Sequence, residues 1–575
     1  MTGLVPVLTG VGVAYITWLL WRWGGDWLES RRLATKRRDK KERCRLALEK
    51  LQRRVEASDL TEAKCHEILQ LSLSELVKKL QTSQLTATDT LHAYQRQALE
   101  VHKKTNCLIE PILEAEALAQ ACDAGQRPGP LCGVPVSLKD CYGLKGYDCT
   151  IGLARWIDRP FDEDCDIVQV LKKQGAVPFV KTNIPQTMYS VETTNPIFGP
   201  TVNPHDTTRS VGGSSGGEGA LIAGGGSILG FGSDIGGSLR IPATMCGVCT
   251  LKPVSQRLSD RGCHPILSGQ KAVPVSYGPL ARDVDSLAIA MKALTVDSTL
   301  YEVATALPPV PFRSEVYEDK KRLRIGFFLN NGVFRAVPCM ERAVLEARDA
   351  LESAGHQLVM YDIGTLGEET FDLWTRHMGA DGGKELMREM KNDAVDVAMG
   401  MVKTLSHLNA YLKWVLYFII RMIKEYKMKV CILHLRCSSV HEYMNLVAET
   451  ERTQIRVMKE WRSLGLDAVI CPAFGFPALL FGSIVEAISA ASYTAMYNAL
   501  NFTAGSVPVT TVTEEDLRKM TDYGTPDPSH SIAKKNMPGS VGLPVNVQVA
   551  TLPWREEVCL RVMKDLQEAL TQQSA

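Results

Sequence analysis

A run of glycine and serine residues is the part of this 575-residue chain that is best suited to chemistry. Residues 210–253 read SVGGSSGGEGALIAGGGSILGFGSDIGGSLRIPATMCGVCTLKP. Small side chains let the backbone come close to a ligand and let its N–H groups point at that ligand. A serine hydroxyl can act as a nucleophile when a base activates it. The run therefore indicates a site at which backbone N–H groups and hydroxyls meet a ligand.

Three kinds of enzyme site could use such a run. A phosphate-binding loop needs a lysine directly after its glycines, and none is present. A dinucleotide fingerprint needs G-x-G-x-x-G after a first strand, and the glycines at 224–232 lack that frame. The pattern G-x-S-x-G does occur at 212–216, and it calls for an aspartate and a histidine further along. His205 and His264 are the nearest histidines, neither in a distinctive context, and the motif alone leaves a histidine triad open.

The elements that would position these residues form an alternating pattern. Residues 133–140, GVPVSLKD, read as a short buried strand, and residues 177–181 look similar. Apolar runs bounded by turn residues predict further core strands at 324–328, 468–472, 507–512 and 543–548. Helical spacing marks residues 60–125, 340–354 and 554–570. This alternation predicts an α/β architecture with a mixed sheet and one large catalytic domain.

Several of these segments together resemble a known family. The segment GGSSGGEGALIAGGGSILGFGSDIGGSLRIPA resembles the signature of the amidase signature family of serine hydrolases, and GVPVSLKD is similar to that family's lysine strand. The resemblance continues in order through KTNIPQTM, NPIFGPTVNP, LKP and GLPVNVQ, and it covers roughly residues 75–570. It implies an amidase-signature fold, with a large twisted mixed β-sheet surrounded by helices. It also implies hydrolysis of an amide or ester.

The resemblance assigns a Ser–Ser–Lys triad. The family's nucleophile falls on Ser238, its bridging serine on Ser214 and its lysine on Lys139. Lys139 ends an apolar strand, where burial would depress the pKa of the amine and let it act as a base. Ser214 would relay the proton between Lys139 and Ser238, and would return it to the leaving amine. The family also has a cis peptide bond before the bridging serine, here Gly213–Ser214.

The resemblance also implies how a substrate carbonyl is held. Met188, Ser190 and Arg240 match positions that line or buttress the family's site, and Ser215 could support the triad through its hydroxyl. The expected oxyanion hole consists of the backbone N–H groups of Ile235, Gly236, Gly237 and Ser238. Losing one such donor costs about 3–4 kcal/mol of transition-state stabilisation.

Composition limits the kinds of partner that this protein is expected to bind. The chain has 65 lysines and arginines against 64 aspartates and glutamates, and this balance argues against a nucleic-acid partner. No cluster of metal ligands stands out, so we expect neither a metal nor a cofactor. The 16 cysteines lie singly, as reduced thiols in a reducing compartment would. Cys246 and Cys249 form the one C-x-x-C, for which a redox role stays open.

The N-terminus carries a membrane signal. Residues 4–21 contain no charge, tryptophans crowd the end of this stretch, and ten basic residues follow between Arg22 and Arg45. We predict a single-pass N-terminal transmembrane helix with the catalytic domain cytosolic, in the endoplasmic reticulum. A buried terminal helix or a targeting peptide is the alternative. The expected division is an anchor over 1–29, a basic juxtamembrane helical segment over 30–70 and the catalytic domain over 71–575.

A second membrane element would set the substrate. Near residues 410–432, apolar residues recur at helical spacing between basic ones, which is typical of an interfacial amphipathic helix. A core helix with a basic outer face is the alternative. A membrane-side entrance favours a lipid amide substrate, namely fatty-acid primary amides and N-acylethanolamines, and we expect a homodimer. Two other functions stay open: a family hydrolase of another amide or ester, and a non-catalytic membrane-associated scaffold.

Overall fold

The computed structural model describes residues 4–574 except 266, 268, 296–301, 305–306, 309, 408–411, 413–414, 416–436, 484–486 and 525–527, with the backbone alone at 4–23, 401–402, 405–407, 528–529 and 574. The strands are β1 (Leu108–Pro111), β2 (Pro135–Lys139), β3 (Val177–Thr182), β4 (Leu229–Asp234), β5 (Cys249–Lys252), β6 (Ser276–Ala281), β7 (Arg324–Phe327), β8 (Gln357–Met360), β9 (Ala468–Pro472), β10 (Thr503–Thr511) and β11 (Pro544–Thr551).

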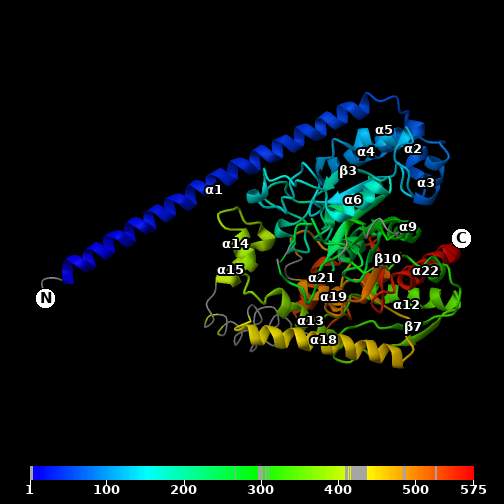
Figure 1. The fold of residues 1–575 in the computed structure, drawn as a ribbon. Helices are drawn as coiled ribbons and strands as arrows, with labels where there is room; N and C mark the ends of the chain where they lie inside the picture. Colours follow the sequence, from blue (N-terminus) through cyan, green and yellow to red (C-terminus); the bar gives the residue numbers. More distant parts are fainter. Residues whose placement is uncertain are drawn as a thin grey trace.

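Helices surround these strands (Figure 1). They are α1 (Leu4–Glu56), α2 (Glu62–Gln70), α3 (Leu73–Gln81), α4 (Ala87–Thr105), α5 (Ala115–Asp123), η1 (Ala154–Trp156), α6 (Asp166–Lys173), η2 (Gln186–Met188), α7 (Gly216–Ala223), α8 (Arg240–Cys246), α9 (Val284–Leu294), α11 (Ser314–Tyr317), α12 (Pro338–Ser353), α13 (Leu366–Met378), α14 (Lys384–Glu389), α15 (Val397–His407), α18 (Val440–Ser463), η3 (Ile488–Ala491), α19 (Ser492–Ala499), α20 (Glu514–Lys519), α21 (Pro528–Asn536) and α22 (Glu556–Ser574).

The described strands form a single mixed sheet. Its order is β1-β3-β2-β4-β6-β5-β10-β11-β9-β7-β8. Strand β2 runs parallel to both β3 and β4, and β7 runs parallel to β8 and β9, whereas the other neighbours are antiparallel. The prediction of an α/β fold with a large mixed sheet is confirmed.

The parallel strands β2 and β4 position the candidate site. All five residues of β2 and all six of β4 are buried. Leu138 pairs with Phe231, so the carboxyl ends of β2 and β4 lie side by side. Because β2 ends at Lys139 and β4 ends at Asp234, the lysine strand and the second half of the glycine-serine run meet at one edge of the sheet.

All six predicted strands are confirmed, with residues 133–140 containing β2, and five further strands were not anticipated. The runs at 177–181, 324–328, 468–472, 507–512 and 543–548 correspond to β3, β7, β9, β10 and β11. Strand β1 lies inside the segment for which the spacing predicted only helices, and it pairs with β3. Strands β4, β5, β6 and β8 were also missed. Each of these five strands pairs with a strand that is distant in the sequence.

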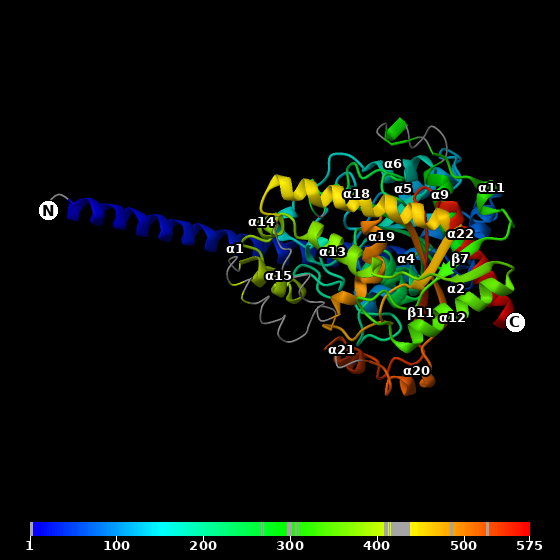
Figure 2. The same ribbon diagram turned by 90° about the horizontal axis from the view of Figure 1, so that it is seen from below.

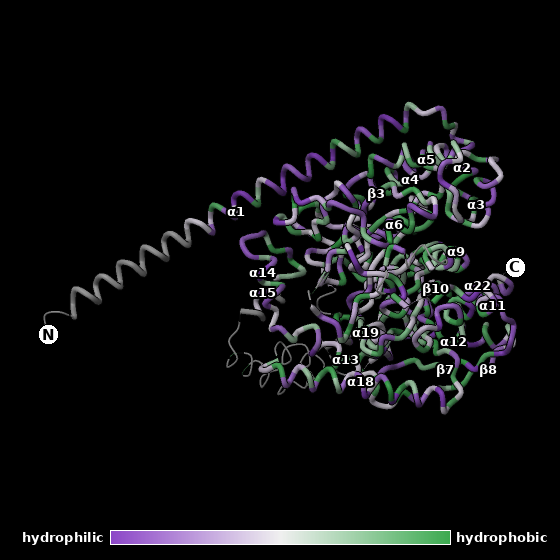
Figure 3. Tube along the Cα trace, viewed as in Figure 1, coloured by the Kyte–Doolittle hydropathy of each residue, from purple (hydrophilic) through white to green (hydrophobic). Residues whose placement is uncertain are grey.

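Helix α1 projects from the body (Figures 1 and 2). Its later part docks on the body through the buried side chains of Leu33, Leu48, Leu51 and Val55. The part of α1 beyond residue 23 is largely hydrophilic (Figure 3). Lys40 is also buried there, and its Nζ lies 3.0 Å from Glu110 and 3.1 Å from Asp148. An ion-paired docked helix therefore forms much of the segment expected at 30–70.

Neither predicted membrane element falls on fully described residues. Within the described residues, no helix is long and apolar enough to cross a bilayer. The stretch expected to span, residues 4–21, has no described side chains, and nearly all of the expected cap at 410–432 lies outside the described residues.

Candidate active site

Lys139 lies at the centre of the candidate site. Its side chain is fully buried, and its Nζ donates to Ser214 Oγ at 2.7 Å and to Ser233 Oγ at 2.9 Å. Burial lowers the pKa of Lys139 to about 8, against the opposing pull of neighbouring acidic groups such as Asp234. With this pKa about a tenth of the amine is neutral at pH 7, far more than for an ordinary lysine, and the neutral amine can accept a proton.

The two predicted serines lie on segments that are tied together. The Gly213–Ser214 peptide bond is cis, as the resemblance implied. The N–H of Ser215 donates to the carbonyl oxygen of Ser238 at 3.1 Å. Among the described residues no hydrogen bond joins the hydroxyls of Ser214 and Ser238. The structure thus brings Lys139 and Ser214 into direct contact and brings Ser238 to them through its backbone.

Asp234 shapes the turn that carries Ser238. Its carboxylate accepts the N–H groups of Gly237 at 2.8 Å and of Leu239 at 3.1 Å. The guanidinium of Arg240 lies 2.9 Å from the same carboxylate, with both side chains fully buried. Burial alone would raise the pKa of Asp234, but the Arg240 charge outweighs it and holds that pKa well below its usual range. Arg240 therefore stabilises the turn by holding Asp234 in its charged form.

This pairing changes the expected oxyanion hole. The N–H of Gly237 is occupied by Asp234, so it is not available to a substrate oxygen in this arrangement. Among the described residues, no acceptor takes the N–H groups of Ile235, Gly236 or Ser238. Gly237 itself has a φ of +122°, a conformation that favours glycine. The prediction of an oxyanion hole therefore stays open for three of the four expected donors.

Two residues that the sequence analysis missed contact the same turn. The indole Nε1 of Trp374 donates to the carbonyl oxygen of Ile235 at 2.8 Å. The hydroxyl of Thr494 donates to the carbonyl oxygen of Gly236 at 2.8 Å. Neither residue stands in a motif. They lie 139 and 258 residues from their partners, so no local spacing could have identified them.

The segment after η2 packs against the bridging serine. Met188 ends η2 and is buried. A Cβ added at Gly213 would lie 2.8 Å from the carbonyl oxygen of Ser190, so this segment touches the backbone just before Ser214. The hydroxyl of Ser215 lies 3.3 Å from the carbonyl oxygen of Ser233, the second partner of Lys139. Both neighbours therefore limit how the lysine and the bridging serine can move.

The contacts of the nearest histidines and of the C-x-x-C cysteines support neither a histidine triad nor a redox motif. His205 Nε2 lies 2.9 Å from the carbonyl oxygen of Cys246, and His264 Nδ1 lies 3.1 Å from that of Pro265. Within the described part of the chain, neither histidine is bonded to a serine. Cys246 and Cys249 direct their thiols to different carbonyl oxygens, those of Val211 and Arg282, and the described cysteines are all free.

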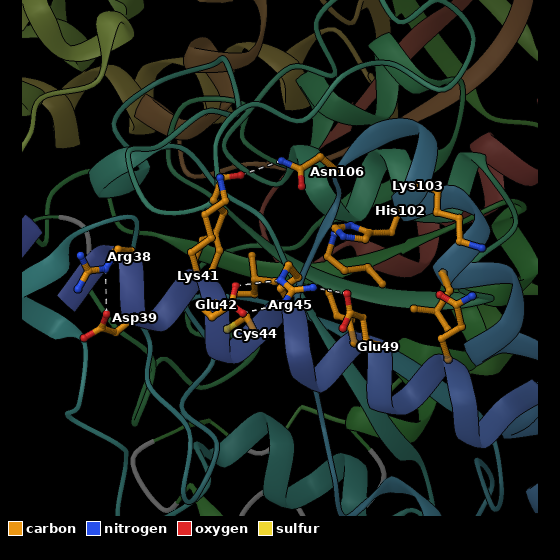
Figure 4. A pocket seen from close by; sticks show the side chains of 16 residues that line it. Arg38, Asp39, Lys41, Glu42, Cys44, Arg45, Glu49, His102, Lys103 and Asn106 are labelled. Carbon is orange, nitrogen blue, oxygen red and sulfur yellow. Dashed lines mark hydrogen bonds and ion pairs between the residues drawn. The ribbon is translucent and has the colours of Figure 1, made fainter. Parts of the chain in front are cut away.

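A cavity of about 600 Å³ lies elsewhere, between α1 and the end of α4 (Figure 4). Arg45 on its α1 wall already pairs with Glu42 and Glu49, and His102 faces it from α4. None of its lining residues belongs to the predicted site. They are Arg38, Asp39, Lys41, Glu42, Cys44, Arg45, Leu48, Glu49, Gln52, Leu99, His102, Lys103, Asn106, Leu108, Ile109 and Phe198.

Comparison with known proteins agrees with this fold and geometry. The family model described as Amidase matches residues 89–560. The chain is 42% identical to fatty-acid amide hydrolase 1 of Sus scrofa over 506 residues, 88% of this chain and 86% of that protein. It is 41% identical to vitamin D3 hydroxylase-associated protein of Gallus gallus over 399 residues, 69% of this chain and 86% of that protein. A solved structure of a fatty acid amide hydrolase aligns with a TM-score of 0.74 at 25% identity, covering 93% of this chain and 90% of that one. The chain therefore belongs to the amidase signature family and is an amidase similar to fatty-acid amide hydrolases.

Proposed function

We propose that this protein is a membrane-bound serine hydrolase that cleaves fatty-acid amides to a fatty acid and an amine. Primary amides and N-acylethanolamines are the expected substrates. The observation that carries the proposal is the 2.7 Å contact between the buried amine of Lys139 and the hydroxyl of Ser214. The likeness to fatty-acid amide hydrolase 1 supports the choice of acyl amides.

The chemistry follows from this contact. Ser238 Oγ attacks the amide carbon while its proton passes to Ser214, whose own proton passes to Lys139 Nζ. The carbonyl π electrons move to oxygen, and the N–H groups of Ile235, Gly236 and Ser238 stabilise that oxyanion. As the C–N bond breaks, the proton returns from Lys139 through Ser214 to the leaving nitrogen. Water then attacks the acyl-enzyme by the same relay and releases the acid.

The membrane part of the proposal rests on the sequence. The uncharged residues 4–21 followed by a basic cluster support a single-pass anchor with the catalytic domain in the cytosol, at the endoplasmic reticulum. The amphipathic pattern near 410–432 supports a second contact with the bilayer beside the substrate entrance. A homodimer would double these contacts.

The test is hydrolysis of oleamide and an N-acylethanolamine by purified membranes, with Ser238→Ala and Lys139→Ala as controls. Turnover that Ser238→Ala abolishes and Lys139→Ala strongly reduces would support a lysine-based lipid amidase. Labelling of Ser238 by a fluorophosphonate without turnover of either amide would keep the hydrolase and reject these substrates. Neither turnover nor labelling would favour a non-catalytic scaffold.

A further inference from the structure

We propose that Trp374 and Thr494 are positioning residues that hold the peptides of the oxyanion hole in the orientation that catalysis needs. The inference rests on the proposed function, because it assumes that Ser238 is acylated beside this turn. Neither residue would touch the reacting atoms. Each acts through the backbone of the turn: Trp374 binds the carbonyl oxygen of Ile235 and Thr494 that of Gly236.

Trp374 fixes the peptide between Ile235 and Gly236. In a trans peptide the C=O and the N–H point in opposite directions. Because the indole Nε1 holds the carbonyl oxygen of Ile235 at 2.8 Å, the N–H of Gly236 must point away from the indole. The ring also packs closely against Gly236, since a Cβ added there would be 2.6 Å from Trp374 Cζ2. The indole thus opposes rotation of this peptide by both a hydrogen bond and contact.

Thr494 contacts the next peptide, which joins Gly236 and Gly237. Its hydroxyl lies 2.8 Å from the carbonyl oxygen of Gly236 and shares its one proton with the carbonyl oxygen of Ala491 at 2.9 Å. The N–H of Gly237 donates to Asp234 at 2.8 Å. The third peptide is tied as well, because the carbonyl oxygen of Gly237 accepts the N–H of Ile241 at 2.7 Å. All three carbonyl oxygens of the turn therefore accept a hydrogen bond. Because the C=O and N–H of a trans peptide point in opposite directions, the N–H groups of Gly236 and Ser238 point away from these donors.

These braces come from two helices that pack on each other. Trp374 lies on α13 and Thr494 on α19, and the two helices run side by side in both ribbon views (Figures 1 and 2). Phe371, one turn before Trp374, stacks on the indole with the ring centroids 6.0 Å apart. The indole is thereby held in place by its own helix, so that it can hold the turn.

The consequence is an effect on the transition state. If a peptide of the turn rotates, a carbonyl oxygen replaces an N–H beside the substrate oxygen, and the charge that develops there is destabilised. The ground-state carbonyl carries less charge, so substrate binding changes little. Losing a brace should therefore lower kcat with little change in KM.

The experiment uses the full-length enzyme in membranes and the substitutions Trp374→Phe and Thr494→Val. Trp374→Phe keeps an aromatic ring and removes the indole N–H, and Thr494→Val removes only the hydroxyl. The control is Trp461→Phe, since Trp461 packs against Tyr361 and Phe502 and not against this turn. The readouts are kcat and KM for oleamide, the inhibition constant of an oleoyl trifluoromethyl ketone, the rate of fluorophosphonate labelling, and Tm. The ketone forms a tetrahedral adduct whose oxyanion occupies the same hole.

We expect each substitution at the turn to lower kcat about 10- to 100-fold, less than the roughly 100- to 1,000-fold for deleting a donor itself. The inhibition constant of the ketone should rise by the same factor, with KM and Tm close to those of the control. A change in KM alone, or an inhibition constant that does not move, would overturn the inference. If the wild-type enzyme labels but does not cleave oleamide, the substrate proposal fails, whereas an unchanged labelling rate in both variants would refute the positioning role separately.

Discussion

At the scale of single residues, the burial of Lys139 determines how the rate should depend on pH. Burial lowers the pKa of Lys139 to about 8, and only the neutral amine accepts a proton. We therefore expect kcat/KM to rise with pH, to pass through an inflection near 8 and to level off above it. In Lys139→Ala the rate should fall by a factor of about 100 to 10,000, and the inflection should vanish.

A second buried lysine provides the control for that profile. Burial lowers the pKa of Lys252 to about 7, and its Nζ donates to the carbonyl oxygen of Pro253 and not to a serine. Lys252→Met should therefore keep the inflection near 8. Profiles of kcat/KM from pH 6 to 10 would decide between the two lysines. An inflection that persists in Lys139→Ala would show that Lys139 is not the group that titrates.

Gly237 is the residue at which the backbone of the site is most demanding. Its φ of +122° strains any other residue, and an added Cβ would lie 2.3 Å from Thr494 Oγ1. We expect Gly237→Ala to cost about 1–3 kcal/mol of stability from backbone strain and to abolish turnover. Gly400→Ala on α15, where an added Cβ meets nothing within 4 Å, should leave both nearly unchanged. Thermal unfolding and turnover measured together test this, and an active Gly237→Ala enzyme would contradict it.

At the scale of elements, one buried ion-paired lysine contributes to the docking of α1 on the sheet. Lys40 lies against Glu110 at the edge strand β1 and against Asp148. Burial alone would lower the pKa of Lys40, but these carboxylates outweigh it and raise that pKa above its usual value. A raised pKa stabilises the fold below the unfolded-state value near 10.5, and that contribution is lost only as the pH rises through the folded-state value. The interaction is therefore fully present at neutral pH.

Lys40→Met should accordingly destabilise the protein by about 3–5 kcal/mol, because it leaves two carboxylates partly buried without their cation. Lys41→Met is the matched control, since Lys41 is the exposed neighbour on the same helix. Urea unfolding of the solubilised protein at pH 7 measures the difference. Equal midpoints for the two variants would mean that α1 docks through its apolar side chains alone.

Elements also show what a sequence can and cannot predict. Strands such as β7 and β9 are bounded apolar runs, and local pattern was sufficient to find them. Strand β1 reads LIEP within a helical spacing and becomes a strand only by pairing with β3. In the same way, the motifs identified Lys139 and Ser214 as partners, whereas Trp374 and Thr494 reach the site only because α13 and α19 fold onto it. Contacts between distant segments carry no local signal, and the catalytic roles stay predictions.

At the scale of the whole molecule, α1 joins the proposed membrane anchor to the catalytic body. The ion pairs and buried side chains that dock α1 lie almost entirely beyond residue 29, from Leu33 to Val55, with Asp26 the exception through its bond to Asn392. Removal of residues 1–29 should therefore leave the fold and the hydrolysis of a soluble short-chain amide intact. It should also remove only part of the binding to the membrane, because the segment near 410–432 remains.

Flotation of the truncated protein with phosphatidylcholine vesicles measures what the second segment contributes. We expect partial flotation, and a further loss when Trp414 and Phe418, which stand four residues apart in the expected apolar face, are both replaced by serine. Replacement of Lys413 and Lys424 by serine is the control for the basic face, and it should weaken binding mainly to anionic vesicles. A truncated protein that stays entirely in the soluble fraction would assign all membrane binding to residues 1–29. In that case the segment near 410–432 would not be a membrane element, and lipid amides would have to reach Ser238 through water.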